Sequence, residues 1–299
     1  MKRQYFTLPL LFPALCSWAG GAGSSRDGQV PAGRGLPNVI VIYADDLGYG
    51  DLQCYGAKNV KTPHVDRLAA EGIRFTNAHS VAATSTPSRY SLLTGEYAWR
   101  RPDTDIAAGN AGMIIRPGQY TMADMFHHAG YATAAIGKWH LGSEPSQRPN
   151  AKGFDTFYGL LAGHRSYFYN PETSDKDGNL QQYQYNGRKL SFDGYFTDEL
   201  ASKAQQFVTE SEQPFMLYMS FTAPHSPNEA TEEDLARFEG QPRQKYAAMM
   251  YALDRGVGKI VDELKAAGKF DNTIIFFLSD NGGSTTNQSS NLPLKGFKG

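Results

Sequence analysis

Apolar residues along the chain fall into short continuous runs that alternate with segments of helical periodicity. Four runs are rich in β-branched and aromatic side chains: residues 38–44, 132–137, 215–221 and 273–279. Because these runs are continuous rather than alternating, they predict strands that are covered on both faces, as in a parallel sheet.

The segments between these runs carry start and stop signals of helices. Residues 62–72 and 121–130 each begin with a threonine that can act as an N-cap and end at a glycine. Longer helices are expected over residues 197–210 and 244–267. Strands that alternate with helices predict the α/β class, with a largely parallel central sheet between layers of helices.

Polar side chains directly follow all four predicted strands. They are Asp45, Asp46, Lys138, His140, His225, Asp280 and Asn281. In open α/β sheets, ligands bind beyond the carboxyl ends of the strands, which parallel strands bring to one edge. Any one of these groups has an ordinary explanation, since Asp and Asn are common in turns. Their recurrence after four buried strands predicts one shared site.

Four of these residues offer hard oxygen ligands, namely Asp45, Asp46, Asp280 and Asn281. Such a set suits Ca²⁺ or Mg²⁺ better than zinc, and calcium is the ion we expect. Taken alone, "ADD" is explained by a cap and "DNGG" by a tight turn. Taken together, the two motifs favour a metal site.

The stretch "ATSTPSRYSLLTG", residues 83–95, is too rich in small hydroxylated residues for a core segment. Thr86 is expected to cap a helix that begins near Pro87. Free backbone N–H groups at such a helix start, together with Arg89 one turn later, predict an anion site. Ser85 beside them is a candidate nucleophile, although the spacing assigns no Ser-His-Asp arrangement.

The segment "STPSRYSLLTG" matches the sulfatase signature, with serine in its first position. Further blocks follow the family order: "NVIVIYADDLGYGDLQCYG", "TPHVDRLAAEGIRFTNAH", "AGYATAAIGKWHLG", "FTAPHSP" and "LSDNGG". From residue 37 onward the chain therefore resembles the type I, formylglycine-dependent sulfatases. The resemblance implies an alkaline-phosphatase/sulfatase-like sandwich. It also implies that residues 37–299 form an incomplete N-terminal catalytic domain, with the C-terminal subdomain missing.

In that family the first residue of the signature is oxidised after translation. The resemblance implies that Ser85 becomes formylglycine (3-oxoalanine) through a serine-type formylglycine-generating enzyme. One hydroxyl of the hydrated aldehyde attacks sulfur, and deprotonation of the other later expels sulfate. An oxygen of the modified Ser85 would complete the shell of one Ca²⁺ ion held by Asp45, Asp46, Asp280 and Asn281.

The resemblance also implies roles for the cationic residues. Arg89 matches the residue that holds the hydrate, and His140 matches the histidine that takes its proton. Lys138 and Lys298 match lysines that contact sulfate oxygens, and His225 matches the group that protonates the leaving alcohol. The ordinary alternatives are solvated loop residues for Lys138 and His140 and a turn histidine for His225.

Two further points stay open in the sequence. "LPLKGFKG" offers Lys295 as well as Lys298, and only the family's Lys-Gly placement favours the second. The tyrosine-rich residues 164–196 predict a hairpin or a loop excursion near the site, with Asn-Gly as a turn signal. In this region His164, Arg165, Tyr167 and Tyr169 are candidates to contact a sugar, with hairpin packing as the alternative.

The expected activity is hydrolysis of sulfate esters, on sulfated carbohydrate or aryl sulfate substrates. One alternative is a phosphatase or phosphodiesterase with Ser85 itself as nucleophile, although such enzymes generally need two metals and more histidine ligands. Another is an inactive, truncated glycan-binding remnant. The 29 basic and 30 acidic side chains leave a net charge of −1, which predicts no general attraction to nucleic acid or anionic membranes.

The N-terminus has the order of a secretory signal peptide, with a basic start, an apolar stretch and then small residues. We expect a signal peptide over residues 1–24 and a flexible tether over residues 25–36. The apolar stretch is too short for a stable membrane span and contains prolines. The protein is therefore expected to be exported, periplasmic or secreted, with lipid anchoring through Cys16 as the less favoured route.

Overall fold

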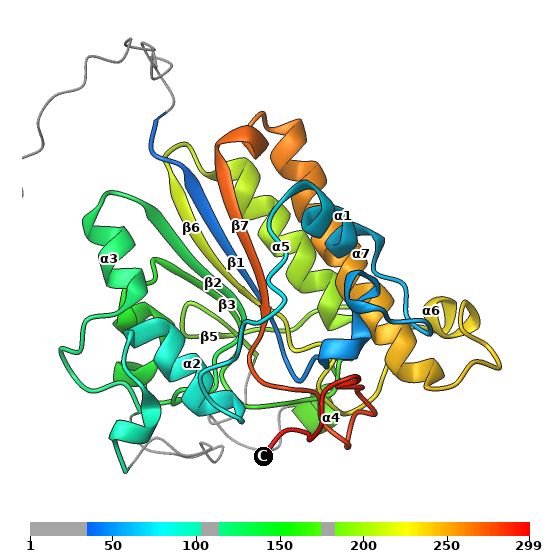
Figure 1. The fold of residues 1–299 in the computed structure, drawn as a ribbon. Helices are drawn as coiled ribbons and strands as arrows, with labels where there is room; N and C mark the ends of the chain where they lie inside the picture. The colour runs from blue at the N-terminus through cyan, green and yellow to red at the C-terminus, as the bar shows by residue number, and fades with distance from the viewer. Residues whose placement is uncertain (1–34, 103–113, 175–182) are drawn as a thin grey trace, which may run out of the picture. The chain divides into compact units, whose positions relative to one another are not determined.

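A seven-stranded sheet lies at the centre of the protein in the computed structural model, which describes residues 35–102, 114–174 and 183–299 (Figure 1). The strand order is β5-β4-β3-β2-β6-β1-β7. The strands are β1 (Asn38–Ala44), β2 (Ala132–Lys138), β3 (Thr156–Leu160), β4 (Tyr183–Tyr185), β5 (Arg188–Lys189), β6 (Phe215–Ser220) and β7 (Thr273–Ser279). In the strand order from β3 to β7 all neighbours are parallel, and the two antiparallel pairings are β3–β4 and β4–β5. The predicted α/β class with a mostly parallel sheet is confirmed.

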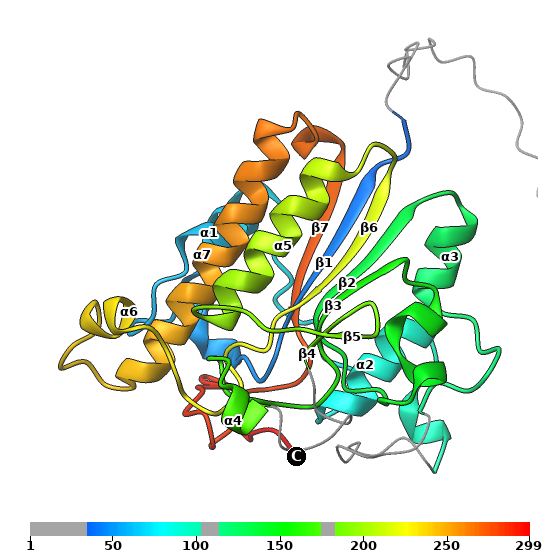
Figure 2. The same ribbon diagram turned by 180° about the vertical axis from the view of Figure 1, so that it is seen from behind.

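Helices cover both faces of this sheet, as the two opposite views show (Figures 1 and 2). One layer contains α1 (Pro63–Glu71), α5 (Phe196–Glu210) and α7 (Gln244–Ala266), and the other contains α2 (Ser85–Thr94) and α3 (Met122–His128). The short helices α4 (Pro171–Ser174) and α6 (Glu232–Ala236) lie outside these layers. None of the helices in the described ranges is long and apolar enough to cross a membrane.

The alternating side chains of β1 divide the core into two halves. Ile40 and Ile42 belong to the cluster that includes Leu253 of α7, whereas Val41 and Tyr43 belong to the cluster under α2 and α3. All seven residues of β1 are buried. A central strand whose side chains pack into a core on each face of the sheet has no polar face. This explains the continuous apolar run in the sequence.

The strand β7 departs from the prediction of coverage on both faces. Ile274 is 46% exposed and Phe276 is 50% exposed. Within the described part of the chain, β7 pairs with β1 alone and forms an edge of the sheet. A continuous apolar run distinguishes a strand well, but it does not say whether helices or further strands lie on each side of it.

The strand β3 is absent from the sequence-based prediction because it is short and contains a glycine. Gly159 faces Gly137 across the β2–β3 pair, and a Cβ on Gly159 would lie 2.0 Å from the Gly137 carbonyl oxygen. The predicted Asn-Gly hairpin is confirmed. Asn186 and Gly187 have φ values of 46° and 81° and connect β4 to β5.

Two predicted helix caps have different outcomes. Thr121 caps α3 as expected, in a capping box with Asp124. Thr62 precedes α1, but its side chain makes no cap bond. Instead, Asp254 of α7 accepts the backbone N–H groups of His64 and Val65 at 3.1 and 2.9 Å. The start of α1 is therefore satisfied by a carboxylate from a packed neighbouring helix.

Candidate active site

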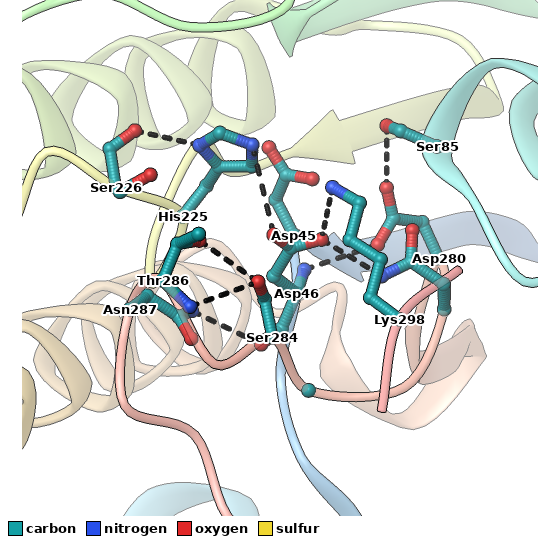
Figure 3. Close-up of polar contacts among 12 residues, drawn as sticks. Asp45, Asp46, Ser85, His225, Ser226, Asp280, Ser284, Thr286, Asn287 and Lys298 are labelled. Carbon is teal, nitrogen blue, oxygen red and sulfur yellow. Dashed lines mark hydrogen bonds and ion pairs between the residues drawn. The ribbon is translucent and has the colours of Figure 1, made fainter. Parts of the chain in front are cut away.

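The structure brings the residues at the strand ends together with the start of α2 (Figure 3). Asp45 and Asp46 follow β1, Lys138 ends β2, His225 follows β6, and Asp280 and Asn281 follow β7. Helix α2 adds Ser85 and Arg89. The backbone links these segments directly, since Asp45 N donates to the Ala223 carbonyl and Asp280 N donates to the Ala44 carbonyl.

Ser85 is the first residue of α2 and is only 2% exposed. Its hydroxyl donates to Asp280 Oδ2 at 2.6 Å and accepts from Arg89 Nε at 2.8 Å. The predicted cap at Thr86 is wrong, because Thr84 holds the N-cap position and Thr86 lies inside the helix. The Thr86 hydroxyl donates to the His140 carbonyl at 3.3 Å, which fixes the loop after β2 against the start of α2.

Arg89 is fully buried and connects the carboxylates of two strand ends. Its Nη2 lies 3.0 Å from Asp280 Oδ2 and 3.4 Å from Asp45 Oδ1. Its Nη1 donates to the hydroxyl groups of Ser220 and Tyr218. Burial by itself lowers the pKa of Arg89, but these anionic and phenolic neighbours raise it above its ordinary value. The guanidinium is therefore a fixed positive charge beside Ser85.

A second buried ion pair joins Lys138 Nζ to Asp45 Oδ2 at 2.6 Å. Burial raises the pKa of Asp45, but Lys138, His225 and Arg89 outweigh it, so the net shift is downward. Burial is also the main cause that lowers the pKa of Lys138, with Asp45 acting against it. Each charge thus stabilises its partner, and both side chains are fully buried.

Asp46 is the meeting point of three other segments. Lys298 Nζ lies 2.7 Å from Asp46 Oδ1, Asn281 Nδ2 donates to the same oxygen at 2.7 Å, and His225 Nε2 lies 3.6 Å from Asp46 Oδ2 (Figure 3). Asp46 has a φ of 61°, a left-handed conformation that is uncommon for any residue other than glycine. Such backbone strain occurs where the surrounding structure fixes it.

The donor set fits a hard divalent cation. Among the described residues, Asp45 Oδ1 and Asn281 Oδ1 are buried oxygens that accept no hydrogen bond. Ligand atoms of Asp45, Asp46 and His225 also lie within 4.8 Å of one another. Buried oxygens without donors are costly unless a cation or water satisfies them. His225 was expected to handle a proton rather than to lie within reach of a metal.

Residues 37–299 match the sulfatase family model. The chain belongs to the sulfatase family. It is 36% identical over 306 residues to an N-acetylgalactosamine-6-O-sulfatase of Bacteroides thetaiotaomicron, an alignment that covers 82% of this chain and 59% of that protein. It is 34% identical to human arylsulfatase G over 82% of this chain and 51% of that protein.

Solved structures share the fold of this chain. The crystal structure of Ps i-CgsB in complex with k-i-k-neocarrahexaose has a TM-score of 0.84 and 37% identity, over 89% of this chain and 63% of that one. A phosphonate monoester hydrolase of Agrobacterium radiobacter, at 20% identity and a TM-score of 0.60, shares the fold alone. This sulfatase chain thus spans about half to three fifths of the length of these family members.

The structure distinguishes the two lysines near the end of this sulfatase chain. Lys295 is exposed, whereas the Lys298 side chain is 19% exposed and contacts Asp46. The backbone places Lys298, because its N–H donates to the Gly283 carbonyl at 3.0 Å. His140 has a φ of 57°, and its ring lies against Gly163, where a Cβ would be 2.7 Å from Nε2.

The candidate sugar contacts after β3 have mixed outcomes. Tyr167 is 2% exposed, and its hydroxyl contacts the carbonyls of Thr222 and His225, both at 2.8 Å. For Tyr167 the structure therefore favours the packing alternative, and this residue supports the His225 loop from within the core. His164 stacks on His225 with ring centroids 5.6 Å apart, which places its ring beside the site.

Several buried residues of the site were missed in the sequence. Asp51 accepts from Arg243, Tyr246 and the backbone N–H of Ser290, and so ties the turn after β1 to the Lys298 segment. Asn287 contacts the loops that carry Asp46 and His225. The signal was the run "NQSSN" after a predicted strand, where amide and hydroxyl side chains are dense. Such runs also occur in ordinary loops, which hides their role.

Proposed function

We propose that this sulfatase-family chain hydrolyses sulfate esters of sulfated carbohydrates, with Ser85 converted to formylglycine and with calcium as the metal. The observation that carries the proposal is the position of Ser85. Its hydroxyl is buried at a helix start, 2.8 Å from a guanidinium and 2.6 Å from a carboxylate, inside the family signature.

The metal would be held by Asp45, Asp46, Asp280 and Asn281, with an oxygen of residue 85. Calcium in this place would supply positive charge to the group being transferred. Asp45 Oδ1 and Asn281 Oδ1 support this assignment, because both are buried oxygens that accept no hydrogen bond in the described structure, although the Arg89 guanidinium lies 3.4 Å from the first.

The chain's own cations would act on the transferred group from two sides. Arg89 Nε fixes the oxygen at position 85 and so orients it for attack. Lys138 and Lys298 add positive charges, held in place by Asp45 and Asp46. Such preorganised charges stabilise a transition state without reorganisation at the moment of reaction.

Two histidines would handle protons. His225, partly exposed and 3.6 Å from Asp46, is placed to donate a proton to the leaving alcohol. His140, whose loop contacts the start of α2 through Thr86, would take a proton from the group at position 85. Sulfated carbohydrate as the substrate class rests on the named activities of the relatives, an N-acetylgalactosamine-6-O-sulfatase among them.

Export to the periplasm or outside the cell is part of the same proposal. It rests on the composition of residues 1–24, which lie outside the described residues, as do Cys16 and most of the predicted tether. Edman sequencing or intact mass of the secreted protein would test it. A mature N-terminus between residues 19 and 26 is the expected result, and a retained Met1 in the exported protein would contradict it.

Peptide mass spectrometry tests the modification. The full chain is expressed with and without a serine-type formylglycine-generating enzyme, which supplies the oxidation. The tryptic peptide that ends at Arg89 also contains Ser80 and Ser88. Oxidation of a serine to formylglycine removes two hydrogen atoms, and fragmentation must place this mass loss at residue 85. Unmodified Ser85 in a preparation that hydrolyses sulfate esters would refute the proposal.

Activity assays test the reaction class. We expect p-nitrophenyl sulfate to be cleaved in preference to p-nitrophenyl phosphate, and we expect Ser85→Ala to abolish turnover. Ser80→Ala is the matched control, because Ser80 is an exposed serine of the same segment and contacts only the Ala82 carbonyl in the described structure. A preference for the phosphate ester would favour a phosphatase instead.

A further inference from the structure

Asn287 lies on the segment after β7 and contacts the loops after β1 and β6. Its side chain is fully buried. Nδ2 donates to the Asp46 carbonyl at 3.2 Å and to the Pro224 carbonyl at 2.8 Å. Oδ1 accepts from the Ser289 backbone N–H at 3.1 Å. One amide thus satisfies two carbonyls and one N–H, on three different stretches of chain.

The orientation of this amide follows from its partners. The reversed amide would set its oxygen against two carbonyl oxygens and its NH₂ against the N–H of Ser289. The Ser289 hydroxyl lies 2.7 Å from the same Asp46 carbonyl and 2.5 Å from Asn287 Oδ1, and its single proton is donated to one of these two oxygens. Asn287 and Ser289 therefore form one network against the backbone of Asp46.

These contacts support the backbone of Asp46. Asp46 has a left-handed backbone with a φ of 61°, a conformation that needs support from its surroundings. Rotation of this backbone would swing the carboxylate away from Lys298, Asn281 and His225. The Pro224 carbonyl immediately precedes His225, so the same amide also fixes the separation of Asp46 from the imidazole.

We infer that Asn287 is a positioning residue, which with Ser289 holds Asp46 in the geometry for cation binding and sets its distance to His225. The inference rests on the proposed function, in which Asp46 is a calcium ligand. Hydrogen-bonded groups behind metal ligands typically change metal affinity by about 10- to 100-fold when they are removed. Asn287 acts on the ligand's backbone rather than on its carboxylate, and this still fixes where the carboxylate points.

The test measures calcium affinity of the full chain by isothermal titration calorimetry for Asn287→Ala and Ser289→Ala. Asn38→Ala is the matched control. Asn38 is also buried and joins three strands, since Nδ2 donates to Thr273 and Oδ1 accepts from the Phe215 N–H. It does so at the opposite ends of β1, β6 and β7, away from the site. Urea unfolding of each variant gives the loss of stability separately.

Asn287→Ala should lower the calcium affinity by about 10-fold or more, and Ser289→Ala should lower it by a smaller factor. Asn38→Ala should keep the wild-type affinity although it also loses stability. Equal calcium affinity of Asn287→Ala, Ser289→Ala and Asn38→Ala would overturn the positioning role while leaving the proposed metal intact. A wild-type chain that binds no calcium would overturn both.

Discussion

The buried guanidinium of Arg89 offers a sharp test of how this site is held together. Arg89 pairs with Asp45 and Asp280, and all three side chains are completely buried. The matched control is Arg255, which also joins two carboxylates, Asp198 and Asp234, but whose side chain is 29% exposed. Both arginines are replaced by alanine, one at a time.

Arg89→Ala should cost about 3 to 5 kcal/mol of unfolding free energy, because it leaves buried carboxylates without their cation. The lower end of that range applies, since Lys138 still pairs with Asp45 at 2.6 Å and Asp280 alone loses its cation. Burial, and then Asp45, already raise the pKa of Asp280, so the stranded group would relieve part of the cost by taking up a proton. Arg255→Ala should cost about 1 kcal/mol, because Arg255 and Asp198 are 29% and 28% exposed and the buried Asp234 keeps Arg237 at 3.6 Å.

The assay is urea unfolding at neutral pH with a calcium chelator present, so that no bound ion replaces the lost charge. Asp280→Asn in the Arg89→Ala background removes the stranded charge and should recover at least about 1 kcal/mol as a coupling energy. The reasoning is refuted if Arg89→Ala costs no more than Arg255→Ala. It is also refuted if Asp280→Asn adds its full separate cost to Arg89→Ala.

Three other predictions concern a lysine, the metal and a helix start. Lys298→Met should slow the hydrolysis of p-nitrophenyl sulfate by about 100-fold, and Lys295→Met should leave it unchanged; a slow Lys295→Met beside an unchanged Lys298→Met would make Lys295 the candidate instead. Calcium at about 100 times its dissociation constant should raise the unfolding free energy by about 2.7 kcal/mol, and Asp45→Asn should abolish the increase; a full increase in that variant would exclude Asp45 as a ligand. Burial raises the pKa of Asp254 to about 6, above its value of about 3.9 in the unfolded chain. The folded state then binds a proton more tightly, so this contribution to stability is full at low pH and is lost as the pH rises from about 4 to about 6. Asp254→Asn should remove that slope, and an unchanged slope in urea unfolding between these pH values would contradict the assignment.

Much of the fold could be predicted because strand patterns and helix caps are local signals. Residues 38–44 and 273–279 are strands with the predicted bounds, and the long helix over 244–266 ends one residue early. The edge position of β7 could not be predicted, because coverage depends on which other segments pack against a strand. The carboxylate that caps α1 is hidden for the same reason, since Asp254 lies 190 residues from His64.

The candidate site was predictable only as a set of residues. Parallel strands bring Asp45, Lys138, His225 and Asp280 to one edge, so their proximity follows from the strand assignment. Their pairings do not follow from it. The sequence alone does not say that Lys138 pairs with Asp45, nor that Lys298 reaches Asp46. Those contacts depend on how far each loop extends beyond its strand.

The charges of the site connect the fold to the proposed chemistry. Arg89, Lys138 and Lys298 each contact a carboxylate that follows β1 or β7. Charge pairs about 4 Å apart interact by about 4 kcal/mol at the effective dielectric of a protein, enough to fix the side chains before a substrate arrives. The three cations are balanced by Asp45, Asp46 and Asp280, so a bound divalent cation would leave the site with an excess of positive charge. The parallel sheet is the cause of this arrangement, because it brings to one edge the strand ends that carry the carboxylates.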